Sequence, residues 1–317
     1  MSRSVLALLF PGQGSQEIGM GKDVFEASKA ARAVYESADE ALGFSISELC
    51  FNGPDETLRR TEIQQPALLT TSVALLRALE ERVDLKMDFV AGHSLGEYSA
   101  LVAARALSLE EAVLTVHRRG GYMQEAVPEG LGAMAAIIGS APEAVAEVCS
   151  EVSIETGRIV SPANYNSPQQ TVIAGEAEGV KQAGELLLEG VAKRVVPLEV
   201  SAPFHCSLMA PAAEKLQVDL AALHFQTPSV PVVTNVEARP NTDSSRMAQL
   251  LYEQVTAPVR FTEMAKYLVG AGVTRFLEVG AGRVLSSLLA RIERRSQRAR
   301  FGGLEDLEGV QEFLQKS

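Results

Sequence analysis

Short apolar runs recur along the chain, and stretches with a helical pattern separate them. The runs are bounded by glycine, proline or polar turns, and several are apolar throughout. Strands that are buried on both faces of a parallel sheet have this composition. We therefore predict strands at residues 5–10, 89–92, 133–138, 159–164, 171–174, 195–200, 230–234 and 275–279.

Helical stretches fill most of the chain between these runs. We predict helices at residues 17–37, 66–82, 97–104, 109–124, 142–151, 178–189, 208–223, 246–254, 262–269 and 284–294. The alternation of strands with helices favours an α/β fold built on a parallel sheet.

The segment between about residue 130 and residue 200 departs from this alternation. Its order is strand, helix, strand, strand, helix, strand, with the turn Asn166-Ser167-Pro168-Gln169 between the two middle strands. This βαββαβ order is that of a ferredoxin-like unit. We predict a large α/β domain, residues 1–128 and 200–317, that carries an inserted ferredoxin-like small domain, residues 129–199. The alternative is that these strands extend the main sheet.

Composition and charge narrow the classes of function. The chain has 317 residues, of which 46% are hydrophobic and 22% charged, as in globular proteins with a sizeable core. Lys and Arg number 29 against 40 Asp and Glu, and a formal net charge of −11 gives no broad field that attracts phosphate. We therefore expect neither a nucleic-acid partner nor a membrane partner.

Cysteine content and the apolar runs bear on location. Cys50, Cys149 and Cys206 are too few and too far apart in the sequence for a disulfide framework, which favours a reducing compartment. The run at 5–10 is too short for a signal peptide, and no apolar stretch reaches membrane-spanning length. We expect a cytoplasmic protein.

The most specific local motif is Gly92-His93-Ser94-Leu95-Gly96, a G-x-S-x-G between a predicted strand and a predicted helix. This context is the one that a nucleophile elbow requires. Ser94 is then the candidate nucleophile, and the N–H of Leu95 would point toward a developing oxyanion. The alternative is an ordinary glycine-rich turn with a capping serine.

A nucleophilic serine needs a base, and the chain has four histidines. His93 adjoins the serine and should point away from it, His117 lies beside two arginines, and His224 ends a predicted helix. His205 follows a predicted strand, where sites of α/β proteins are built. His205 is therefore the candidate base, and the alternative is a structural histidine.

The third member of a hydrolase triad is missing from the sequence. An α/β-hydrolase has the order serine, acid, histidine, yet no Asp lies between Ser94 and His205. The Glu residues there fall on predicted helices or in turns. A plain hydrolase triad is therefore doubtful, and a backbone carbonyl or an amide is the alternative partner for the imidazole.

Two other glycine-rich turns follow strands, but neither matches a nucleotide-binding pattern. Glu17 stands at the third glycine position after the turn at 12–14, and Leu285 stands there after the turn at 280–282. Neither turn has a P-loop lysine, and no spacing of Cys and His matches a metal site. The residues thus indicate no metal site and no nucleotide fold.

Many ordered blocks resemble the malonyl-CoA:acyl carrier protein transacylases of bacterial fatty acid synthesis. The resemblance covers nearly the whole chain and includes FPGQGSQ at 10–16, QQPALLTTSVAL at 64–75, AGHSLGEYSAL at 91–101, RRGGYMQEAVPEGLGAMAAIIG at 118–139, NYNSPQQTVIAG at 164–175, APFHCSLMAPAAEKL at 202–216, the Gln-x-x-x-Pro-Val of 254–259 and EVGAGRVLSSL at 278–288. It implies a hydrolase-like large domain with a ferredoxin-like insertion.

The resemblance also implies a ping-pong acyl transfer. Ser94 would take the malonyl group from malonyl-CoA, and the phosphopantetheine thiol of a holo acyl carrier protein would then remove it. His205 would act as base and acid in turn, and Gln254 matches the family position that orients this histidine. Gln13 and the Leu95 N–H would supply the oxyanion hole. No cofactor is implied, because the CoA thioester is a substrate.

Three further residues match substrate positions of the family. Arg119 would pair with the free malonyl carboxylate, and Asn164 matches a position of the substrate channel. Phe204 matches a pattern associated with malonyl rather than methylmalonyl selection. Arginine offers a planar fork for a buried carboxylate, which supports the assignment of Arg119 on physical grounds. A surface role is the alternative for this arginine.

Other functions stay open at the level of the sequence. A trans-acting acyltransferase that loads polyketide synthase carriers would use the same residues. A serine hydrolase or thioesterase differs only in letting water reach the acyl-enzyme, and a non-catalytic carrier-binding protein would not need Ser94 and His205. Five arginines within 291–300 form a candidate docking face for an acidic carrier; the alternative is a solvated helix end.

Overall fold

The computed structural model describes residues 4–200 and 202–315, and its larger sheet has six strands in the order β10-β9-β1-β2-β7-β8. All neighbouring strands in it are parallel except β7 and β8, which are antiparallel. The strands are β1 (Val5–Phe10), β2 (Phe89–Gly92), β7 (Val232–Val233), β8 (Pro240–Asn241), β9 (Val273–Val279) and β10 (Gln297–Phe301).

Apolar side chains cover both faces of this sheet. Along β1, Leu6 and Leu8 belong to one apolar core and Ala7 and Leu9 to another, because successive side chains of a strand point to opposite faces. The helices that belong to this part are α1 (Lys22–Ala27), α2 (Lys29–Leu42), α3 (Ile46–Asn52), α4 (Asp55–Leu58), α5 (Thr61–Glu80), α6 (Gly96–Ala103), α7 (Leu109–Glu125), α10 (Ala210–Ala221), α11 (Met247–Thr256), α12 (Phe261–Gly270), α13 (Val284–Ile292) and α14 (Leu307–Gln315), with short 3₁₀ helices at Ser207–Met209, Ser244–Arg246 and Leu304–Asp306.

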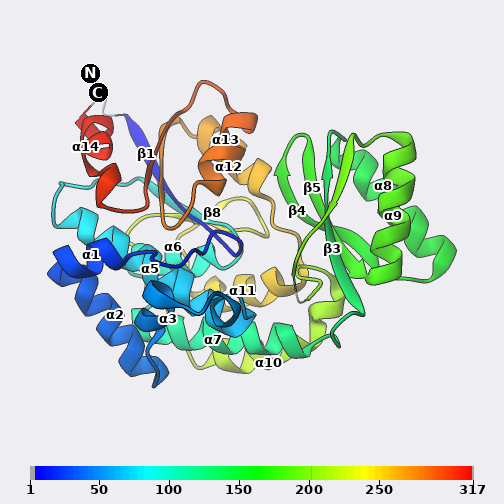
Figure 1. The fold of residues 1–317 in the computed structure, drawn as a ribbon. Helices are drawn as coiled ribbons and strands as arrows, with labels where there is room; N and C mark the ends of the chain where they lie inside the picture. Colours follow the sequence, from blue (N-terminus) through cyan, green and yellow to red (C-terminus); the bar gives the residue numbers. More distant parts are fainter. Residues whose placement is uncertain (1–3, 201, 316–317) are drawn as a thin grey trace.

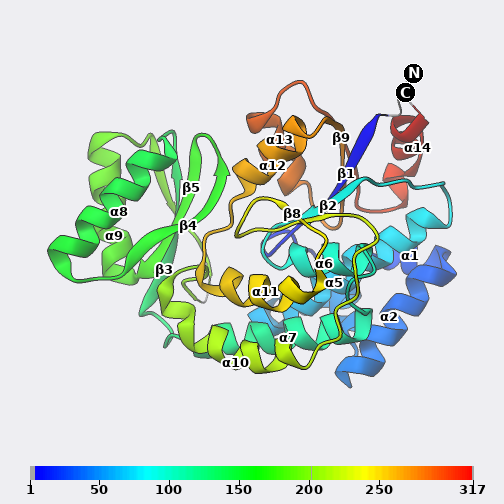
Figure 2. The ribbon, with the colours of Figure 1, turned by 180° about the vertical axis from the view of Figure 1, so that it is seen from behind.

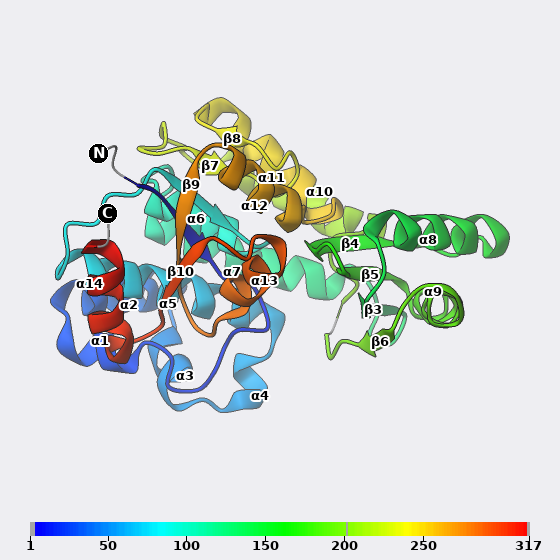
Figure 3. The ribbon, with the colours of Figure 1, turned by 90° about the horizontal axis from the view of Figure 1, so that it is seen from above.

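A second sheet of four strands lies beside the first (Figure 1). It is antiparallel, with the order β4-β5-β3-β6, which is the strand order of a ferredoxin-like unit. Seen from above, α8 and α9 lie on the side away from the larger sheet, where they enclose a separate apolar core (Figure 3). The elements are β3 (Gly132–Ile138), α8 (Pro142–Thr156), β4 (Val160–Ser167), β5 (Gln170–Glu176), α9 (Ala177–Gly190) and β6 (Arg194–Pro197).

After β6 the chain returns to the larger part of the molecule. The view from behind shows α10 and α11 beside α7, below the larger sheet (Figure 2). The described ends of the chain lie near one another, because α14 packs on β10 close to the start of β1 (Figure 1). The predicted domain limits at 128/129 and 199/200 stay predictions.

Several predicted elements differ from the observed ones for physical reasons. The helix predicted at 17–37 is broken at Ser28, whose extended backbone ends α1 and whose hydroxyl accepts the Ala31 N–H to begin α2. Strand β10 was not predicted because its arginines look like a solvated charge run. An edge strand tolerates such charges, since one of its sides is unpaired.

Helix α5 begins at Thr61, five residues before the proline that was predicted to start it. A proline inside a helix leaves the carbonyl four residues earlier without its usual partner. Here that carbonyl belongs to Glu62, and Nδ1 of His117 lies 2.7 Å from it. His117 therefore has a structural role in joining α7 to α5.

Candidate active site

The G-x-S-x-G motif forms a tight turn between β2 and α6. Ser94 lies in this turn with a left-handed backbone, φ 52°. A Cβ at Gly92 would come within 2.0 Å of the Gly96 backbone, and one at Gly96 within 2.1 Å of the Phe10 carbonyl oxygen. Both glycines are thus required by close backbone approach, and the turn has the geometry of a nucleophile elbow.

Asn235 holds this elbow from the neighbouring strand. The Ser94 N–H donates to its Oδ1 over 2.6 Å, and its Nδ2 donates to the Gly92 carbonyl over 2.7 Å. Asn235 follows β7, so it lies at the carboxyl edge of the sheet as Ser94 does. Asn235 is not among the site residues predicted from the sequence; its position just after a predicted strand was the available signal.

His205 lies against the serine. Its Nε2 is 2.7 Å from Ser94 Oγ, and its Nδ1 is 2.9 Å from the main-chain oxygen of Gln254. A carbonyl can only accept, so Nδ1 carries the hydrogen in the neutral ring and Nε2 is left to accept the serine O–H. Burial and the Arg119 charge lower the pKa of His205 to about 3, so the ring is neutral at rest and its Nε2 has a free lone pair toward the serine.

Arg119 is a buried cation beside the same serine. Only 1% of its surface is exposed, and Nη2 donates to Ser94 Oγ at 3.1 Å and to Gln254 Oε1 at 2.9 Å. Its Nη1 donates to Gln65 Oε1 at 2.7 Å, and Nε has no hydrogen-bond partner within the described parts of the chain. Arg118, by contrast, is exposed and pairs with Asp219.

No described carboxylate forms an ion pair with Arg119, although the guanidinium lies over the Tyr98 ring. An isolated charge in the interior is costly unless it has an opposite charge as partner. Burial lowers the pKa of Arg119 accordingly. The site therefore favours a ligand that brings its own carboxylate to the guanidinium.

Gln254 contacts both sides of the site. Its main-chain oxygen faces Nδ1 of His205. A backbone carbonyl was one of the two alternatives to a carboxylate as partner of the imidazole. Its side chain instead lies between Arg119, the Ser94 carbonyl and the carboxyl of Glu97, which its Nε2 contacts at 2.7 Å. The proposed orientation of His205 thus rests on the backbone of Gln254, and the amide has a separate set of partners.

The two residues that were predicted to form an oxyanion hole lie near the elbow. Leu95 directly follows Ser94 and precedes α6, so its N–H is at the start of that helix. Gln13 lies on the loop after β1, where its side chain donates to Gln64 Oε1 at 2.6 Å. Its side-chain amide is therefore engaged elsewhere, which leaves its backbone N–H as the candidate donor.

Asn164 and Phe204 are both nearly buried, with 7% and 6% of their surfaces exposed. Asn164 lies on β4, and its neighbour Asn166 places Oδ1 2.9 Å from His93 Nε2. That contact joins β4 to the elbow, and it was not predicted from the sequence. Phe204 precedes His205 in a loop where the latter has φ 61°.

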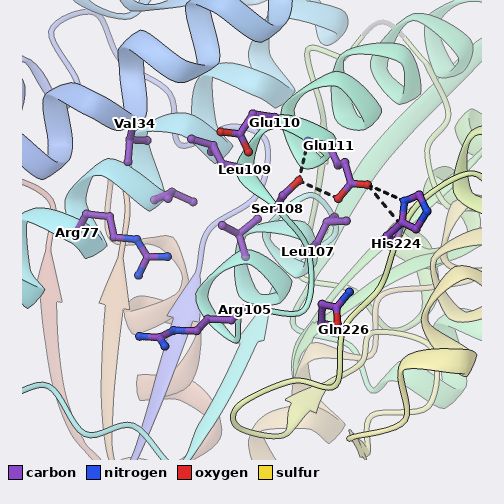
Figure 4. Close-up of a pocket in the computed structure, with 12 residues that line it drawn as sticks. Val34, Arg77, Arg105, Leu107, Ser108, Leu109, Glu110, Glu111, His224 and Gln226 are labelled. Carbon is purple, nitrogen blue, oxygen red and sulfur yellow. Dashed lines mark hydrogen bonds and ion pairs between the residues drawn. The ribbon is translucent and has the colours of Figure 1, made fainter.

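His224, another histidine considered from the sequence, does not join this cluster. His224 is exposed and faces Glu111 in a pocket lined by Arg77 and Arg105, which contains neither Ser94 nor Arg119 (Figure 4). The three cysteines are free and buried. In the described ranges 4–200 and 202–315, no group of three or more His, Cys, Asp or Glu side chains is arranged to hold a metal ion, and no helix has the length and apolarity to span a membrane.

These features define an α/β protein with a serine–histidine pair at a strand–turn–helix elbow and a buried arginine beside it. A family model described as acyl transferase domain matches residues 7–299. The chain therefore belongs to the acyl transferase family.

Proteins that are similar in sequence along most of the chain carry names that fit this family. The malonyl CoA-acyl carrier protein transacylase of Bacillus subtilis (strain 168) is 51% identical over 292 residues, 92% of each chain. The protein of the same name from Escherichia coli (strain K12) is 46% identical over 286 residues, 90% of this chain and 92% of that protein.

Solved structures are similar along almost the whole length. The malonyl CoA-acyl carrier protein transacylase of Coxiella burnetii superposes with a TM-score of 0.96 at 39% identity, and the match covers 99% of both chains. A malonyl-transacylase solved in complex with its type II PKS acyl-carrier protein superposes with a TM-score of 0.94 at 43% identity, over 98% of this chain and 99% of that one. The predicted fold class, with a hydrolase-like part and a ferredoxin-like part, is thereby confirmed.

Proposed function

We propose that this protein transfers the malonyl group from malonyl-CoA to the phosphopantetheine thiol of holo acyl carrier protein in fatty acid biosynthesis. The observation that carries the proposal is Arg119, a buried guanidinium 3.1 Å from Ser94 Oγ that forms no ion pair with a carboxylate of the described residues. An acyl group with a free carboxylate supplies the missing charge. The names of the relatives support the same substrate and acceptor.

In the first half-reaction, Ser94 Oγ attacks the thioester carbon of malonyl-CoA. The serine proton moves to His205 Nε2, which lies 2.7 Å away and is neutral. The bond from carbon to sulfur then breaks, and the CoA thiolate takes the proton from the imidazolium. Malonyl-serine and free CoA result.

In the second half-reaction the carrier thiol reacts with the malonyl-serine. His205 Nε2 takes the thiol proton, the sulfur attacks the ester carbon, and Ser94 Oγ leaves and regains the proton. Backbone N–H groups of Leu95 and Gln13 are the proposed donors to the oxyanion in both halves. Because only protons and the acyl group move, His205 suffices as the proton carrier, and we propose that no cofactor takes part.

Arg119 has a different task from this pair. Its fork would bind the malonyl carboxylate and hold the acyl group in one orientation, without speeding attack at the thioester. Asn164 and Phe204 are proposed to line the substrate channel. A cytoplasmic location remains a prediction.

A second candidate is the loading of polyketide synthase carriers. It is favoured by the likeness to a malonyl-transacylase solved with a type II PKS acyl-carrier protein. The test is a transfer assay with malonyl-CoA and purified holo carriers of both kinds. Faster transfer to the fatty-acid carrier supports the proposal, whereas faster transfer to the polyketide carrier supports the second candidate. Release of malonate to water with neither carrier acylated would make the protein a hydrolase.

A further inference from the structure

Glu97 is a buried carboxyl group that the proposed reaction does not use. It lies in the first turn of α6, three residues after Ser94, and 2% of its surface is exposed. Burial raises its pKa to about 7. A carboxyl group in such a place is costly unless hydrogen bonds satisfy it, so its partners indicate what it does.

Two donors from distant segments meet on one oxygen of Glu97. The Asn235 N–H donates to Oε2 over 3.0 Å, and Gln254 Nε2 donates to the same atom over 2.7 Å. Asn235 is the residue that holds the Ser94 N–H, and Gln254 is the residue that contacts Arg119. Glu97 therefore touches the supports of both the nucleophile and the guanidinium.

The Gln254 amide has one orientation that suits all its neighbours. Its Nε2 has two hydrogens, which go to Glu97 Oε2 and to the Ser94 carbonyl, and its Oε1 accepts from Arg119 Nη2. Rotating the amide by half a turn would place its oxygen against two acceptors and its N–H groups against the guanidinium donors. Glu97 is the strongest of these acceptors when it is ionised.

We propose that Glu97 is a positioning residue for acyl-group selection: through the Gln254 amide it fixes the guanidinium of Arg119 beside Ser94 Oγ. This inference rests on the proposed function, since it concerns which acyl group the site prefers. Glu97 contacts neither Ser94 Oγ nor the imidazole, so the chemistry of the serine does not depend on it directly.

Substitutions at Glu97 separate positioning from folding. Glu97→Gln keeps an oxygen that can accept from both donors, whereas Glu97→Ala removes it. The matched control is Glu278→Ala, because Glu278 is also fully buried and accepts two backbone N–H groups, from Leu285 and Ser286, at the start of α13. It has no contact with Gln254 or Arg119.

The measurement is kcat/KM for malonyl-CoA and for acetyl-CoA, with their ratio as the readout. Glu97→Ala should lower the malonyl-to-acetyl ratio by about tenfold, as coupled neighbours do. Glu97→Gln should restore the ratio to within about twofold of the wild type, and Glu278→Ala should leave it unchanged even where it lowers stability. In an Arg119→Ala background, Glu97→Ala should no longer change the ratio.

The outcomes distinguish this inference from the proposed function. A wild-type protein that does not prefer malonyl-CoA contradicts the proposed function itself. A wild type that prefers malonyl-CoA, together with an unchanged ratio in Glu97→Ala, overturns only the role of Glu97. If Glu97→Ala does not fold, Gln254→Met replaces it, because this variant removes the amide that links Glu97 to Arg119. An unchanged malonyl-to-acetyl ratio in Gln254→Met would also overturn the role of Glu97.

Discussion

Ser94 and His205 share an unusual backbone, with φ values of 52° and 61°. Non-glycine residues in this region are strained by roughly 1–3 kcal/mol and persist only where surrounding contacts hold them. For Ser94 those contacts are the Asn235 side chain and the close approach of two glycines. In this backbone conformation Ser94 Oγ lies 2.7 Å from Nε2 of His205.

Replacing His205 should slow transfer while the fold persists. We expect His205→Ala to reduce kcat/KM by roughly two to four decades, because the serine then loses its general base. Steady-state transfer rates measure the loss, and circular dichroism checks the fold. Wild-type activity in a folded variant would show that another group takes the proton.

The pH dependence of the reaction should reflect the lowered pKa of His205. The imidazole acts as a base only when neutral, and with a pKa of about 3 it is neutral at all pH values well above that. The kcat/KM for malonyl-CoA should therefore stay level as the pH falls from about 8 to about 5. Glu97→Gln, which has no carboxyl group there to titrate, is the control. An acid limb at the ordinary histidine pKa of 6.5, present in both proteins, would contradict the account.

Removing Arg119 should change substrate choice more than chemistry. A charge-assisted pair is worth roughly 1.5–3 kcal/mol, so Arg119→Ala should reduce kcat/KM for malonyl-CoA by about 10- to 150-fold. Acetyl-CoA, which lacks the distal carboxylate, should lose nothing. An equal loss for both thioesters would mean that Arg119 maintains the fold, binds CoA or acts on Ser94 Oγ, to which its Nη2 donates. An unchanged preference would direct attention to Arg118.

At the scale of elements, the sequence of the segment from α13 to β10 suggests a run of solvent-exposed arginines. In the structure, however, three of the five arginines have hydrogen-bond or ion-pair partners. Arg298 bonds to Glu293 and Ser296, and Arg300 pairs with Glu305 and Asp306. Arg291 donates to Gln170, which joins α13 to β5. The exposed side chains of Arg294 and Arg295 form no hydrogen bond or ion pair with the described part of the chain.

Those two arginines are the proposed contact for an acidic carrier. Changing Arg294 and Arg295 together to Glu should raise the KM for the carrier, because the rim would then repel its charge. The half-reaction with malonyl-CoA should not change. The matched control is Arg239→Glu, an exposed change on a different segment. Loss of the first half-reaction instead would place the CoA phosphates at this face, and no change in either half would exclude docking there.

The sequence predicts elements well where burial makes them apolar and poorly where it does not. The strands at 5–10 and 89–92 match β1 and β2, since both are enclosed by two layers. Strand β10 and helix α14 were missed because they lie at the edge of the larger sheet, where polar residues are tolerated. The first predicted helix is interrupted at a single serine, Ser28. Because one capping residue hardly changes the pattern of apolar positions, this break could not be predicted from that pattern.

Site residues, too, could be predicted from the sequence only where the local sequence constrains them. Ser94 was predictable because the glycines around it are required locally, and His205 because few histidines compete. Asn235 was not, since its contact with Ser94 spans 141 positions and depends on how β7 pairs with β2. Gln254 was indicated only by the resemblance to a family. In the structure its backbone oxygen, and not its side-chain amide, faces the imidazole.

At the scale of the whole molecule, the ferredoxin-like sheet completes the site. The edge of β4 continues to the segment after α11, where the N–H of Tyr165 donates to the Val259 oxygen and the Val259 N–H to the Ala163 oxygen. Asn166 on the same strand bonds to His93 beside the nucleophile. The two sheets thus meet at the elbow, and Ser94 retains only 7% of its surface exposed.

In the proposed reaction Ser94 carries the acyl group between two thiols. Intact-protein mass spectrometry after mixing with malonyl-CoA tests this step, with the modified peptide then located by fragmentation. We expect one malonyl group on Ser94, removed quickly by holo acyl carrier protein and slowly by buffer alone, and no adduct on Ser94→Ala. A malonylated Ser94→Ala protein, or an adduct that water removes as fast as the carrier does, would contradict the account.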